Sequence, residues 1–452
     1  MEIRYISTNR LNGIGKTSPL SFTDALSKGI ADDGGLFMPD SIPQLNPAAI
    51  SSFSKMDYPD IAFRVLREYI GSALPETELI RLLKDAYDFE VPIEKADDKT
   101  YIMRLDRGPT ASFKDFAARF MARMMARLKP AGKKITILVA TSGDTGSAVG
   151  EAFKGLEGIK VYILYPTAEV SPIQKKQLDS IGENVSALEL SGTFDDCQKI
   201  VKQAFFDKDL QHLNLSSANS INIARILPQS VYYFYAFSRV SMDGQPIIFS
   251  VPSGNLGNSF GCEVARRMGL PVKRLILAVN SNKEVAELLQ TGEYRKIEPS
   301  VNCISNAMNV GNPSNLARYF DAFGGWLEKN GDVLKKPDLT KMNEILFSRS
   351  ISDEETRQTI VAFHNKYKIL LEPHGAVGVR ALELYRAING SADTAVCLET
   401  AHPAKFPETI TSELGLVPEL PEALKHLNGR ESCSVRLPCE FQAVKEYISG
   451  CN

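Results

Sequence analysis

The sequence predicts an α/β protein of two lobes, each built on a doubly wound parallel sheet, with an extra N-terminal domain. Three observations carry this prediction. From residue 133 onward, short and almost wholly apolar runs alternate with helical patterns, as parallel strands buried on both faces require. The alternation restarts after residue 240, which indicates a second sheet. Residues 1–97 do not share it and are assigned to a separate domain.

The N-terminal domain, residues 1–97, has helical patterns but no motif that carries chemistry. A helix is predicted over 23–30, where the acidic and glycine-rich turn 32–35 ends it. Two more helices are predicted over 60–69 and 77–89. We interpret this domain as a packing or capping domain.

The large lobe is predicted to comprise residues 98–132 and 240–452. Its first helix starts in GPTASFKD (108–115), where Ser112 and Asp115 have the spacing of a capping box. Apolar residues then recur at i, i+3, i+4 and i+7 as far as Leu128, which predicts one buried face. Lys114 lies in the first turn, where the helix dipole and nearby apolar side chains disfavour its ammonium form.

The small lobe, residues 133–239, is predicted from four strand-and-helix units in one short segment. Its strands are expected over 135–141, 161–166, 185–192 and 212–219, and its helices over 147–154, 172–181, 194–206 and from about Ile223. In the large lobe, strands are expected within 246–259, 275–280 and 394–400, and covering helices over 283–289, 315–323, 353–366 and 377–388.

Composition excludes several classes of function. The net charge is −2, so no electrostatic argument favours nucleic acid or an anionic membrane as a partner. The N-terminus has no apolar leader pattern and no apolar run reaches membrane-spanning length. Seven cysteines occur without a CxxC pair, so neither a zinc site nor any other metal is expected. We therefore expect a cytoplasmic protein.

Two motifs are glycine-containing turns between a strand and a helix. PSGNLGN (252–258) allows close approach of the backbone and presents amides, which suits a phosphate. It lacks the GxGxxG spacing and a Walker lysine, so a nucleotide is not expected. TSGDTGS (141–147) gathers hydroxyls and amides at a helix start, which suits a carboxylate or a phosphate. Taken alone, each is explained equally well as an ordinary turn or helix cap.

Two other motifs supply an arginine and a hydroxyl. NSINIARILPQ (219–229) places Ser220, Asn222 and Arg225 at a helix start, and arginine favours fork-like contact with an oxyanion. Alone, Arg225 is better explained as a solvated side chain. LETAHPAKF (398–406) offers the Thr400 hydroxyl at a strand end, whereas His402 is better explained as a packed, hydrogen-bonded histidine.

All four motifs fall at the carboxyl ends of predicted strands, where open α/β sheets bind ligands. Together with Lys114 they offer one amine, a phosphate cup, two further anion-binding loops and a neutral hydroxyl. A lone lysine is usually a surface residue. The set as a whole suits a cofactor with a phosphate and an aldehyde, and predicts pyridoxal phosphate held as a Schiff base on Lys114.

Across nearly its whole length the sequence resembles the threonine synthases, in the tryptophan-synthase-β-like group of pyridoxal-phosphate enzymes (fold type II). The segments that carry the resemblance are SFTDALSKGIADDGGLFMP, GPTASFKD, ATSGDTGSA, NSINIARILPQ, PSGNLGN, NPSN, EPHGAVG and AHPAKF. Several of these are long and ungapped, so the resemblance is specific.

The resemblance implies roles for individual residues. Lys114 would carry the cofactor and act as the catalytic base. The implied cofactor-binding residues are Lys114, Phe113, Asp144, Gly254, Asn255, Leu256, Gly257, Asn258 and Thr400, the last facing the pyridine nitrogen. The implied substrate-binding residues are Thr141, Ser142, Gly143 and Thr145 for a carboxylate, and Ser220, Asn222 and Arg225 for a phosphate.

Two positions depart from the wider group. Many relatives have Asn where Asp144 stands, although Asp is usual in this longer form of threonine synthase. Relatives commonly carry Asp where Asn309 lies, so Asn309 is assigned no role.

The reaction that the resemblance implies converts O-phospho-L-homoserine and water to L-threonine and phosphate, by γ-elimination and β-replacement. Lys114 would remove the Cα and Cβ protons, phosphate would leave from Cγ, and water would add at Cβ. A monomer or homodimer is expected. One alternative is a related phospholyase or a serine/threonine dehydratase, which would release ammonia. Another is a non-catalytic anion-binding protein, which would purify colourless.

Overall fold

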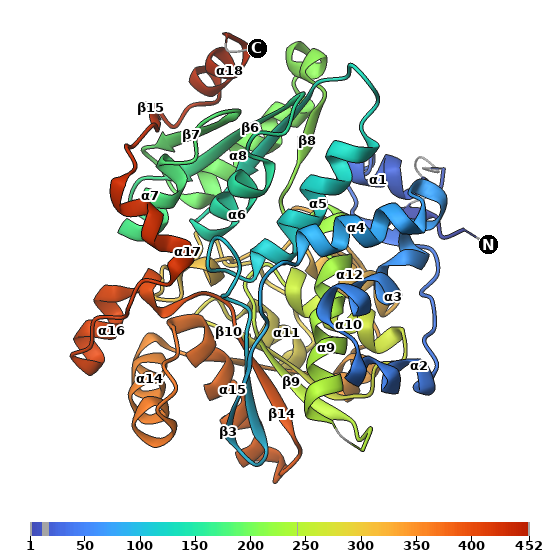
Figure 1. Ribbon diagram of the computed structural model, residues 1–452, viewed down its shortest axis with the longest axis vertical. Helices are drawn as coiled ribbons and strands as arrows, with labels where there is room; N and C mark the ends of the chain where they lie inside the picture. Colours follow the sequence, from blue (N-terminus) through green and yellow to red (C-terminus); the bar gives the residue numbers. More distant parts are fainter. Residues whose placement is uncertain (1, 11–17, 242, 451–452) are drawn as a thin grey trace.

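The computed structural model describes residues 2–10, 18–241 and 243–450, and within them two main sheets of five and six strands lie at opposite ends of the molecule (Figure 1). Helix α5 (Lys114–Leu128) lies between the two sheets (Figure 1). This arrangement confirms the prediction of two α/β lobes.

The smaller sheet has the strand order β15-β7-β6-β5-β8, and all of its pairings are parallel. Its central strands are buried on both faces because successive side chains point to opposite sides. Ile137 and Val139 pack toward the core that contains α6 and α7, whereas Leu138 and Ala140 pack in the core that contains α8 and α18. The bounds are β5 (Ile135–Ala140), β6 (Ile159–Pro166), β7 (Val185–Leu190), β8 (Leu215–Ser217), β15 (Val435–Leu437), α6 (Asp144–Phe153), α7 (Pro172–Asp179), α8 (Phe194–Phe206) and α18 (Phe441–Gly450).

The C-terminal segment returns to the small lobe, whereas the sequence assigns all of residues 240–452 to the large lobe. Strand β15 pairs with β7, and α18 places Val444 and Ile448 in the core beneath α8. The sequence carries little signal for this return, because β15 has only three residues and no long apolar run. Its partner strand is 245 or more residues away, so only tertiary pairing reveals it.

The larger sheet has the order β13-β10-β9-β14-β4-β3, parallel except for the edge pair β3–β4. Alternate residues of β14 enter two different cores: Val396 and Leu398 enter one, and Ala395 and Cys397 enter the other. The strands are β3 (Ile93–Asp97), β4 (Thr100–Arg104), β9 (Ile247–Pro252), β10 (Val272–Val279), β13 (Leu346–Ser350) and β14 (Ala395–Glu399). The helices of this lobe are α9 (Val231–Val240), α10 (Gly257–Arg267), α11 (Glu284–Thr291), α12 (Leu316–Ala322), α13 (Leu339–Ile345), α14 (Asp353–Tyr367), α15 (Pro373–Asn389), α16 (Pro407–Leu414) and α17 (Glu422–Lys425). A hairpin of β11 (Trp326–Leu327) and β12 (Val333–Lys335) lies beside α12.

The N-terminal elements pack directly on the large lobe and share one continuous apolar core with it. They lie on the side of α9 and α10 in Figure 1. An aromatic cluster joins them, with Tyr58 of α3 and Phe89 both against Phe116 of α5. The bounds are β1 (Tyr5–Ser7), α1 (Phe22–Lys28), β2 (Phe37–Pro39), α2 (Pro47–Ser52), α3 (Tyr58–Ile70) and α4 (Glu76–Ala86).

Helix α5 confirms the predicted apolar periodicity and is buried on more than one face. Its less buried stripe consists of three arginines spaced four residues apart. Each of them pairs with an acidic side chain from the N-terminal elements: Arg119 with Asp88, Arg123 with Asp85 and Arg127 with Glu78. The N-terminal elements therefore hold the helix whose first residue is Lys114.

Several predicted helix starts differ from the structure. Helix α15 begins at Pro373, four residues before the predicted start at 377. Helix α6 begins at Asp144, three residues before the predicted start at 147. The segment predicted to begin a helix near Ile223 instead forms two 3₁₀ helices, η5 (Ile223–Arg225) and η6 (Leu227–Ser230), before α9. Pro228 has no amide hydrogen and therefore interrupts an α-helical ladder there.

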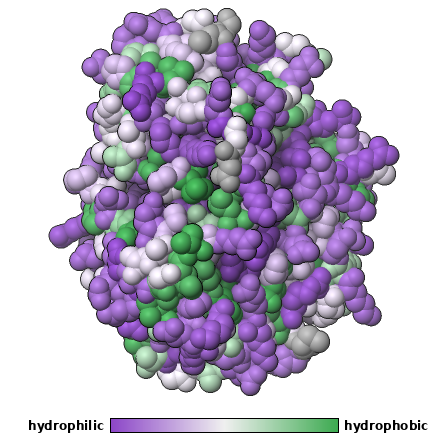
Figure 2. Space-filling view, turned by 60° about the vertical axis from the view of Figure 1, so that its left-hand side comes forward, coloured by the Kyte–Doolittle hydropathy of each residue, from purple (hydrophilic) through white to green (hydrophobic). Residues whose placement is uncertain are grey.

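Among the described residues, no helix is long and apolar enough to cross a membrane. The face in Figure 2 is mostly hydrophilic, with hydrophobic atoms gathered in smaller patches.

Candidate active site

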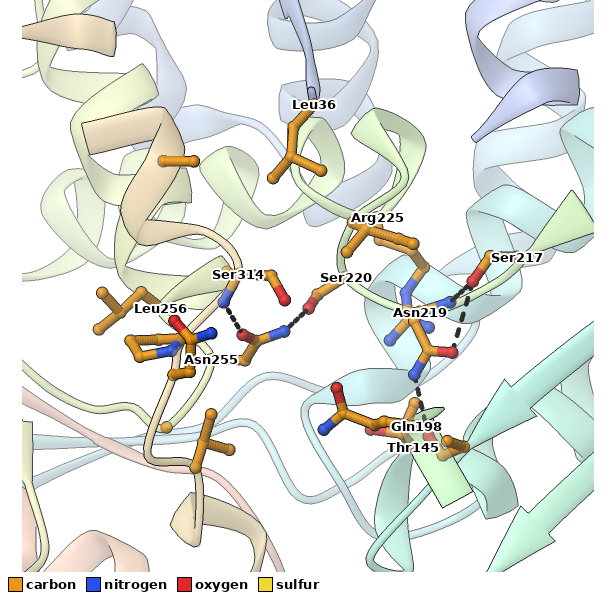
Figure 3. A pocket seen from close by; sticks show the side chains of 18 of the residues that line it. Leu36, Thr145, Gln198, Ser217, Asn219, Ser220, Arg225, Asn255, Leu256 and Ser314 are labelled. Carbon is orange, nitrogen blue, oxygen red and sulfur yellow. Dashed lines mark hydrogen bonds between the residues drawn. The ribbon is translucent and has the colours of Figure 1, made fainter. Parts of the chain in front are cut away.

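A cavity of about 230 Å³ lies where the carboxyl ends of the strands of both sheets meet. Its walls come from the start of α5, the loops after β5, β8, β9 and β14, helix α8 and the N-terminal segment. Figure 3 shows Leu36, Thr145, Gln198, Ser220 and Asn255 from five of these walls. Every predicted cofactor- or substrate-binding residue except Gly143 and Asn222 lines it: Phe113, Lys114, Thr141, Ser142, Asp144, Thr145, Ser220, Arg225, Gly254, Asn255, Leu256, Gly257, Asn258 and Thr400. Long-range folding thus brings together residues from five separate segments, namely GPTASFKD and the four other motifs.

Lys114 is the first residue of α5, and its side chain is 13% exposed. Its Nζ lies 3.9 Å from Asp144 Oδ2 and 4.9 Å from the centre of the Phe113 ring. Burial lowers the pKa of Lys114 to about 8; the nearby charges of Lys405 and Arg225 act in the same direction, and Asp144 and Glu372 oppose them. A neutral amine is therefore accessible near pH 7, as the sequence predicted.

The capping box predicted for Ser112 and Asp115 is wrong. The Asp115 carboxylate instead accepts hydrogen bonds from the amide and hydroxyl of Thr110, at 2.9 and 2.7 Å. Ser112 forms a β-bridge with Ala401, which holds it extended beside the loop that follows β14. The Ser112 hydroxyl accepts only a long hydrogen bond of 3.4 Å from the amide of Lys114, so no capping box forms.

Asp144 is the first residue of α6 and is 1% exposed. Its Oδ1 accepts hydrogen bonds from Gln174 Nε2 and from Lys405 Nζ, both at 2.9 Å. Burial opposes ionisation of Asp144, but the charges of Lys405 and Lys114 outweigh burial and hold the pKa of the carboxyl below its usual range. Asp144 is therefore a buried carboxylate between two lysines.

Sequence reasoning missed Lys405, which lies in the 3₁₀ helix η8 (Pro403–Lys405) with no exposed side-chain surface. The signal was present in AHPAKF, where a lysine follows a strand and is surrounded by apolar residues. Lysines in such surroundings need a buried partner.

The glycine-rich loop connects β9 to α10 and forms one wall of the cavity. Leu256 adopts a left-handed conformation (φ 58°), and α10 starts without a side-chain cap. A Cβ on Gly254 would lie 2.7 Å from Met308 Cα, so the loop passes too close to its neighbour for a larger residue. The open amides of α10 make a cup suited to an anion.

Two side chains hold this loop in place. Asn255 lies between Ser220 and Ser314, donating to Ser220 Oγ at 2.6 Å and accepting from the Ser314 amide at 2.6 Å (Figure 3). Asn258 donates to the carbonyl of Pro252 at 2.9 Å. Asn255 and Asn258 therefore shape the cup.

Arg225 is 3% exposed and points into the cavity region beside Asn219 (Figure 3). One nitrogen donates to the carbonyl of Ala218, whereas its buried Nε has no partner among the described residues. Burial lowers the pKa of Arg225 to about 10, against the opposing charge of Asp115. A buried guanidinium with an unused donor is suited to bind an anion.

The side chain of Asn222 is occupied within the protein, and it does not line the cavity as predicted. Its Nδ2 donates to the carbonyls of Leu26 and Ser217, and its Oδ1 caps η5 at Ala224. Asn222 therefore connects α1 to the loop that carries Arg225.

The loop after β5 lines the cavity with Thr141, Ser142, Asp144 and Thr145. The Thr141 hydroxyl accepts hydrogen bonds from the amides of Gly143 and Gly146, at 3.0 and 2.9 Å. Gly143 has φ 127° and lies against Gln174, so it shapes the turn without lining the cavity. The residue before α6, Gly143, has no side chain to cap the helix, so Thr141 makes the side-chain hydrogen bond to its third residue, Gly146.

Thr400 lines the cavity and lies next to a buried hydrogen-bonded group that the sequence did not reveal. Its hydroxyl donates to Glu372 Oε1 at 3.3 Å. Glu372 Oε2 also contacts His374 Nδ1 at 2.5 Å, and His374 Nε2 accepts from the amide of Ala307 at 3.1 Å. Because Nε2 accepts, the proton of a neutral His374 lies on Nδ1.

His402 fits the packed role expected of it. Its Nδ1 accepts from the amide of Ala404 at 3.2 Å, and burial lowers its pKa to about 4.

The N-terminal segment contributes Thr8, Asn9, Ile30, Gly34, Gly35 and Leu36 to the cavity wall. The interpretation of residues 1–97 as packing alone is therefore incomplete. Asn9 accepts from Trp326 Nε1 at 3.1 Å, so this segment is also tied to the hairpin beside α12.

The residues present fit a cofactor that has both an aldehyde and a phosphate. Lys114 supplies the amine, and the uncapped start of α10 with its closely packed Gly254 supplies a phosphate cradle. No group of three or more potential metal ligands occurs within the described part of the chain.

Comparison with known families gives three matches. Residues 70–400 match "Pyridoxal-phosphate dependent enzyme", residues 4–87 match "Threonine synthase N terminus", and residues 375–448 match "Threonine synthase, C-terminal". The last of these covers the segment that returns to the small lobe.

Individual relatives agree with the family matches. The chain is 39% identical to a threonine synthase of Haemophilus influenzae and 36% identical to one of Escherichia coli, covering 95% of this chain and 96% of each relative. A pyridoxal-phosphate-bound threonine synthase structure from Brucella melitensis superposes with a TM-score of 0.90 at 35% identity, covering 99% of both chains. The Escherichia coli threonine synthase structure has a TM-score of 0.89 at 34% identity, covering 99% of this chain and 100% of that one. Fold, cavity and similarity along the whole chain thus lead to one conclusion: the chain belongs to the threonine synthase family of pyridoxal-phosphate-dependent enzymes.

Proposed function

We propose that this enzyme converts O-phospho-L-homoserine and water to L-threonine and phosphate. The observation that carries the proposal is one cavity that combines a buried lysine amine with two separate anion-binding positions. One position suits the phosphate of the cofactor and the other suits the phosphate of the substrate. The threonine synthases to which the chain is similar support this assignment.

The cofactor would be held by Lys114 through its aldehyde and by residues 254–258 through its phosphate. Thr400 and Asp144 would contact its ring, and Phe113 would pack beside it. When bound, pyridoxal phosphate supplies an electron sink that stabilises negative charge next to the substrate amine.

Lys114 is the proposed general base and acid. Its amine, once released from the cofactor by the incoming substrate amine, takes the proton from Cα and then one from Cβ. It returns a proton to Cγ, which becomes the methyl carbon of the product after phosphate has left. Water then adds its hydroxyl at Cβ, and a proton is returned to Cα, so that the hydroxyl of threonine comes from solvent and the Cα–H bond is restored.

Arg225 and Ser220 are the proposed binding residues for the departing phosphate. The unused Nε of Arg225 supports this role, because it can donate to an oxygen whose negative charge grows as the Cγ–O bond breaks. Ser220 is held by Asn255 and Asn315, which fixes the position of its hydroxyl. Asn222 positions the loop and is not proposed to touch the substrate.

The loop 141–145 is the proposed site for the substrate carboxylate. The open start of α6 and the hydroxyls of Ser142 and Thr145 support this role, whereas the Thr141 hydroxyl already orders the loop. We place the enzyme in the cytoplasm as a monomer or homodimer. The six cysteines within the described residues are free thiols, which supports a reducing compartment.

The test is to incubate the holoenzyme with O-phospho-L-homoserine and to measure phosphate, threonine and ammonia. Equal amounts of phosphate and threonine are expected. Ammonia in place of threonine would show a phospholyase or dehydratase instead. Lys114→Ala is expected to form neither phosphate nor threonine and to lose the visible absorbance that borohydride removes. Lys445→Met, outside the cavity, should keep both the activity and the absorbance.

A further inference from the structure

Lys405 is a fully buried lysine that the proposed reaction does not use. It does not line the cavity, and its side chain has no exposed surface. Its neighbours in sequence, Pro403, Ala404 and Phe406, are apolar and buried. Burying an ammonium group in such a place is costly unless a partner of opposite charge compensates it.

That partner is Asp144, which belongs to the other lobe. Lys405 follows β14 of the larger sheet, whereas Asp144 begins α6 on the smaller sheet. The bond from Lys405 Nζ to Asp144 Oδ1, at 2.9 Å, therefore crosses between the lobes. A second hydrogen bond between the lobes lies beside it. Gln174 of α7 donates to the same oxygen of Asp144 and accepts from Asn306 of the large lobe at 2.9 Å.

The two oxygens of Asp144 are used differently. Oδ1 accepts from Lys405 and Gln174, and Oδ2 is left facing Lys114 Nζ at 3.9 Å. Lys405 thus fixes which oxygen is directed at the reacting amine. It also places a second positive charge behind the carboxylate.

We propose that Lys405 is a positioning residue for Lys114, which orients Asp144 across the lobe boundary and offsets its charge so that the Lys114 amine stays neutral more of the time. The proposal rests on the proposed role of Lys114 as the residue that binds the cofactor. Asp144 is part of the same proposal. A buried carboxylate that faced only the Lys114 amine would hold that amine protonated, and the positive charge of Lys405 counteracts this effect.

The charges that face Lys114 come from four elements and act in opposite directions. Burial lowers its pKa, and so do Lys405 and Arg225, whereas Asp144 and Glu372 raise it. Removing Lys405 removes a cation and also frees Asp144 to pair with Lys114, so both effects raise the pKa of Lys114. Removing the charge of Asp144 lowers it. A purely structural role for Lys405 would not produce opposite directions in the two variants.

The test uses the full-length chain stripped of cofactor. Pyridoxal phosphate is added at a series of pH values, the initial rate of bond formation is followed by visible absorbance, and the bond is trapped with borohydride and assigned to Lys114 by peptide mass. Because only the neutral amine reacts, the midpoint of the rate profile reports the pKa of Lys114. This readout does not depend on turnover.

The wild-type midpoint is expected near the pKa of about 8. Lys405→Met should move it upward by one pH unit or more, which lowers the rate at pH 7 about tenfold. Asp144→Asn should move it downward, and Lys405→Arg should keep it near the wild-type value. Lys445→Met is the matched control, because Lys445 pairs with two carboxylates, Asp207 and Asp209, away from the cavity.

An unchanged midpoint in Lys405→Met, or a shift of Lys405→Met and Asp144→Asn in the same direction, overturns the proposal. If Lys405→Met does not fold, Asp144→Asn is compared with the double variant Asp144→Asn/Lys405→Met. The second substitution removes a cation and must then raise the midpoint; no rise overturns the proposal as well. If borohydride traps the cofactor of the wild-type protein on a residue other than Lys114, the result contradicts the proposed function and not this proposal alone.

Discussion

At the scale of the residue, the candidate site depends on two buried basic side chains, one that burial makes easier to deprotonate and one that is left with an unused hydrogen-bond donor. Lys114 loses hydration, which favours its neutral form, and Arg225 keeps its charge but has a donor without a partner. Both features arise from desolvation in a cavity that is lined largely by apolar groups. The same effect acts outside the site, at Glu284 in α11.

Arg225→Gln is expected to lower kcat/KM for O-phospho-L-homoserine by about 10- to 100-fold, because a hydrogen bond to a charged group contributes about 1.5–3 kcal/mol. Initial rates of phosphate release measure this effect. Arg436→Gln, which removes an exposed arginine paired with Glu189, should leave the rate unchanged. Unaltered kcat/KM in Arg225→Gln would exclude Arg225 from the substrate site.

Glu284→Gln is expected to make the protein more stable at neutral pH. Burial raises the pKa of Glu284 to about 7, and its Oε2 has no partner within the described residues. The folded-state pKa lies above the unfolded one, so the wild-type protein loses stability as pH rises from about 4.5 to 7. The glutamine variant should avoid this loss, which amounts to up to about 3 kcal/mol at pH 8 and nothing near pH 4.

Chemical denaturation at pH 4.5, 6 and 8 measures the difference between Glu284→Gln and wild type. Glu408→Gln, at an exposed position in the first turn of α16, is the control, and its difference in unfolding free energy from wild type should not increase with pH. A constant difference across this pH range would contradict the prediction.

At the scale of the element, three helices begin at the cavity, and none of them has a capping box. These are α5, α6 and α10. Helices such as α7, α8 and α14 instead carry complete capping boxes. At α5, Ser112 accepts from the amides of the first two residues, and at α6 the Thr141 hydroxyl accepts from Gly146. The starts of α6 and α10 still direct the partial positive charge of a helix N-terminus at the cavity, which suits phosphate and carboxylate groups.

Gly254→Ala is expected to weaken the binding of pyridoxal phosphate by about 10- to 100-fold. The new Cβ would lie 2.7 Å from Met308 Cα, a backbone atom that cannot move cheaply, so the loop must shift away from its phosphate-binding shape. Titration of the stripped protein with cofactor, followed by visible absorbance, measures the affinity. Gly429→Ala, where a Cβ meets nothing within 4 Å, is the matched control. Equal affinities in the two variants would show that loop shape does not limit binding.

At the scale of the whole molecule, both lobes and the N-terminal segment are needed to complete the cavity. The small lobe is itself completed by the C-terminal end of the chain, through β15 and α18. Contacts that cross between lobes, such as Lys405 with Asp144, then join the two lobes beside the cavity.

Ile448→Ala is expected to destabilise the small lobe by about 2–5 kcal/mol, because Ile448 is fully buried in the core shared by α18 and α8. Urea denaturation should show the midpoint of the first transition at a lower concentration than in wild type. Ser449→Ala, at the exposed neighbouring position, is the control. If both variants unfold at the same concentration, α18 does not support the small lobe.

The local sequence pattern alone determined the fold class, most of the strands and the positions of the main motifs. Apolar runs such as 135–140 reveal strands buried on both faces, since each side chain must be apolar when helices cover both sides. The position of Lys114 at a helix start, and of the glycine-rich loop at a strand end, followed from the same patterns. The family resemblance then connected these motifs to one cofactor.

Only the tertiary structure decided which distant residues meet. Lys405 and Asp144 are 261 positions apart, β15 joins a strand far from it in sequence, and Asn222 is bonded to Leu26 of α1. The N-terminal residues that line the cavity carry no motif by which they could be found. Periodicity reports which face of an element is buried, but pairing between elements depends on the shape and charge of surfaces that exist only after the chain has folded.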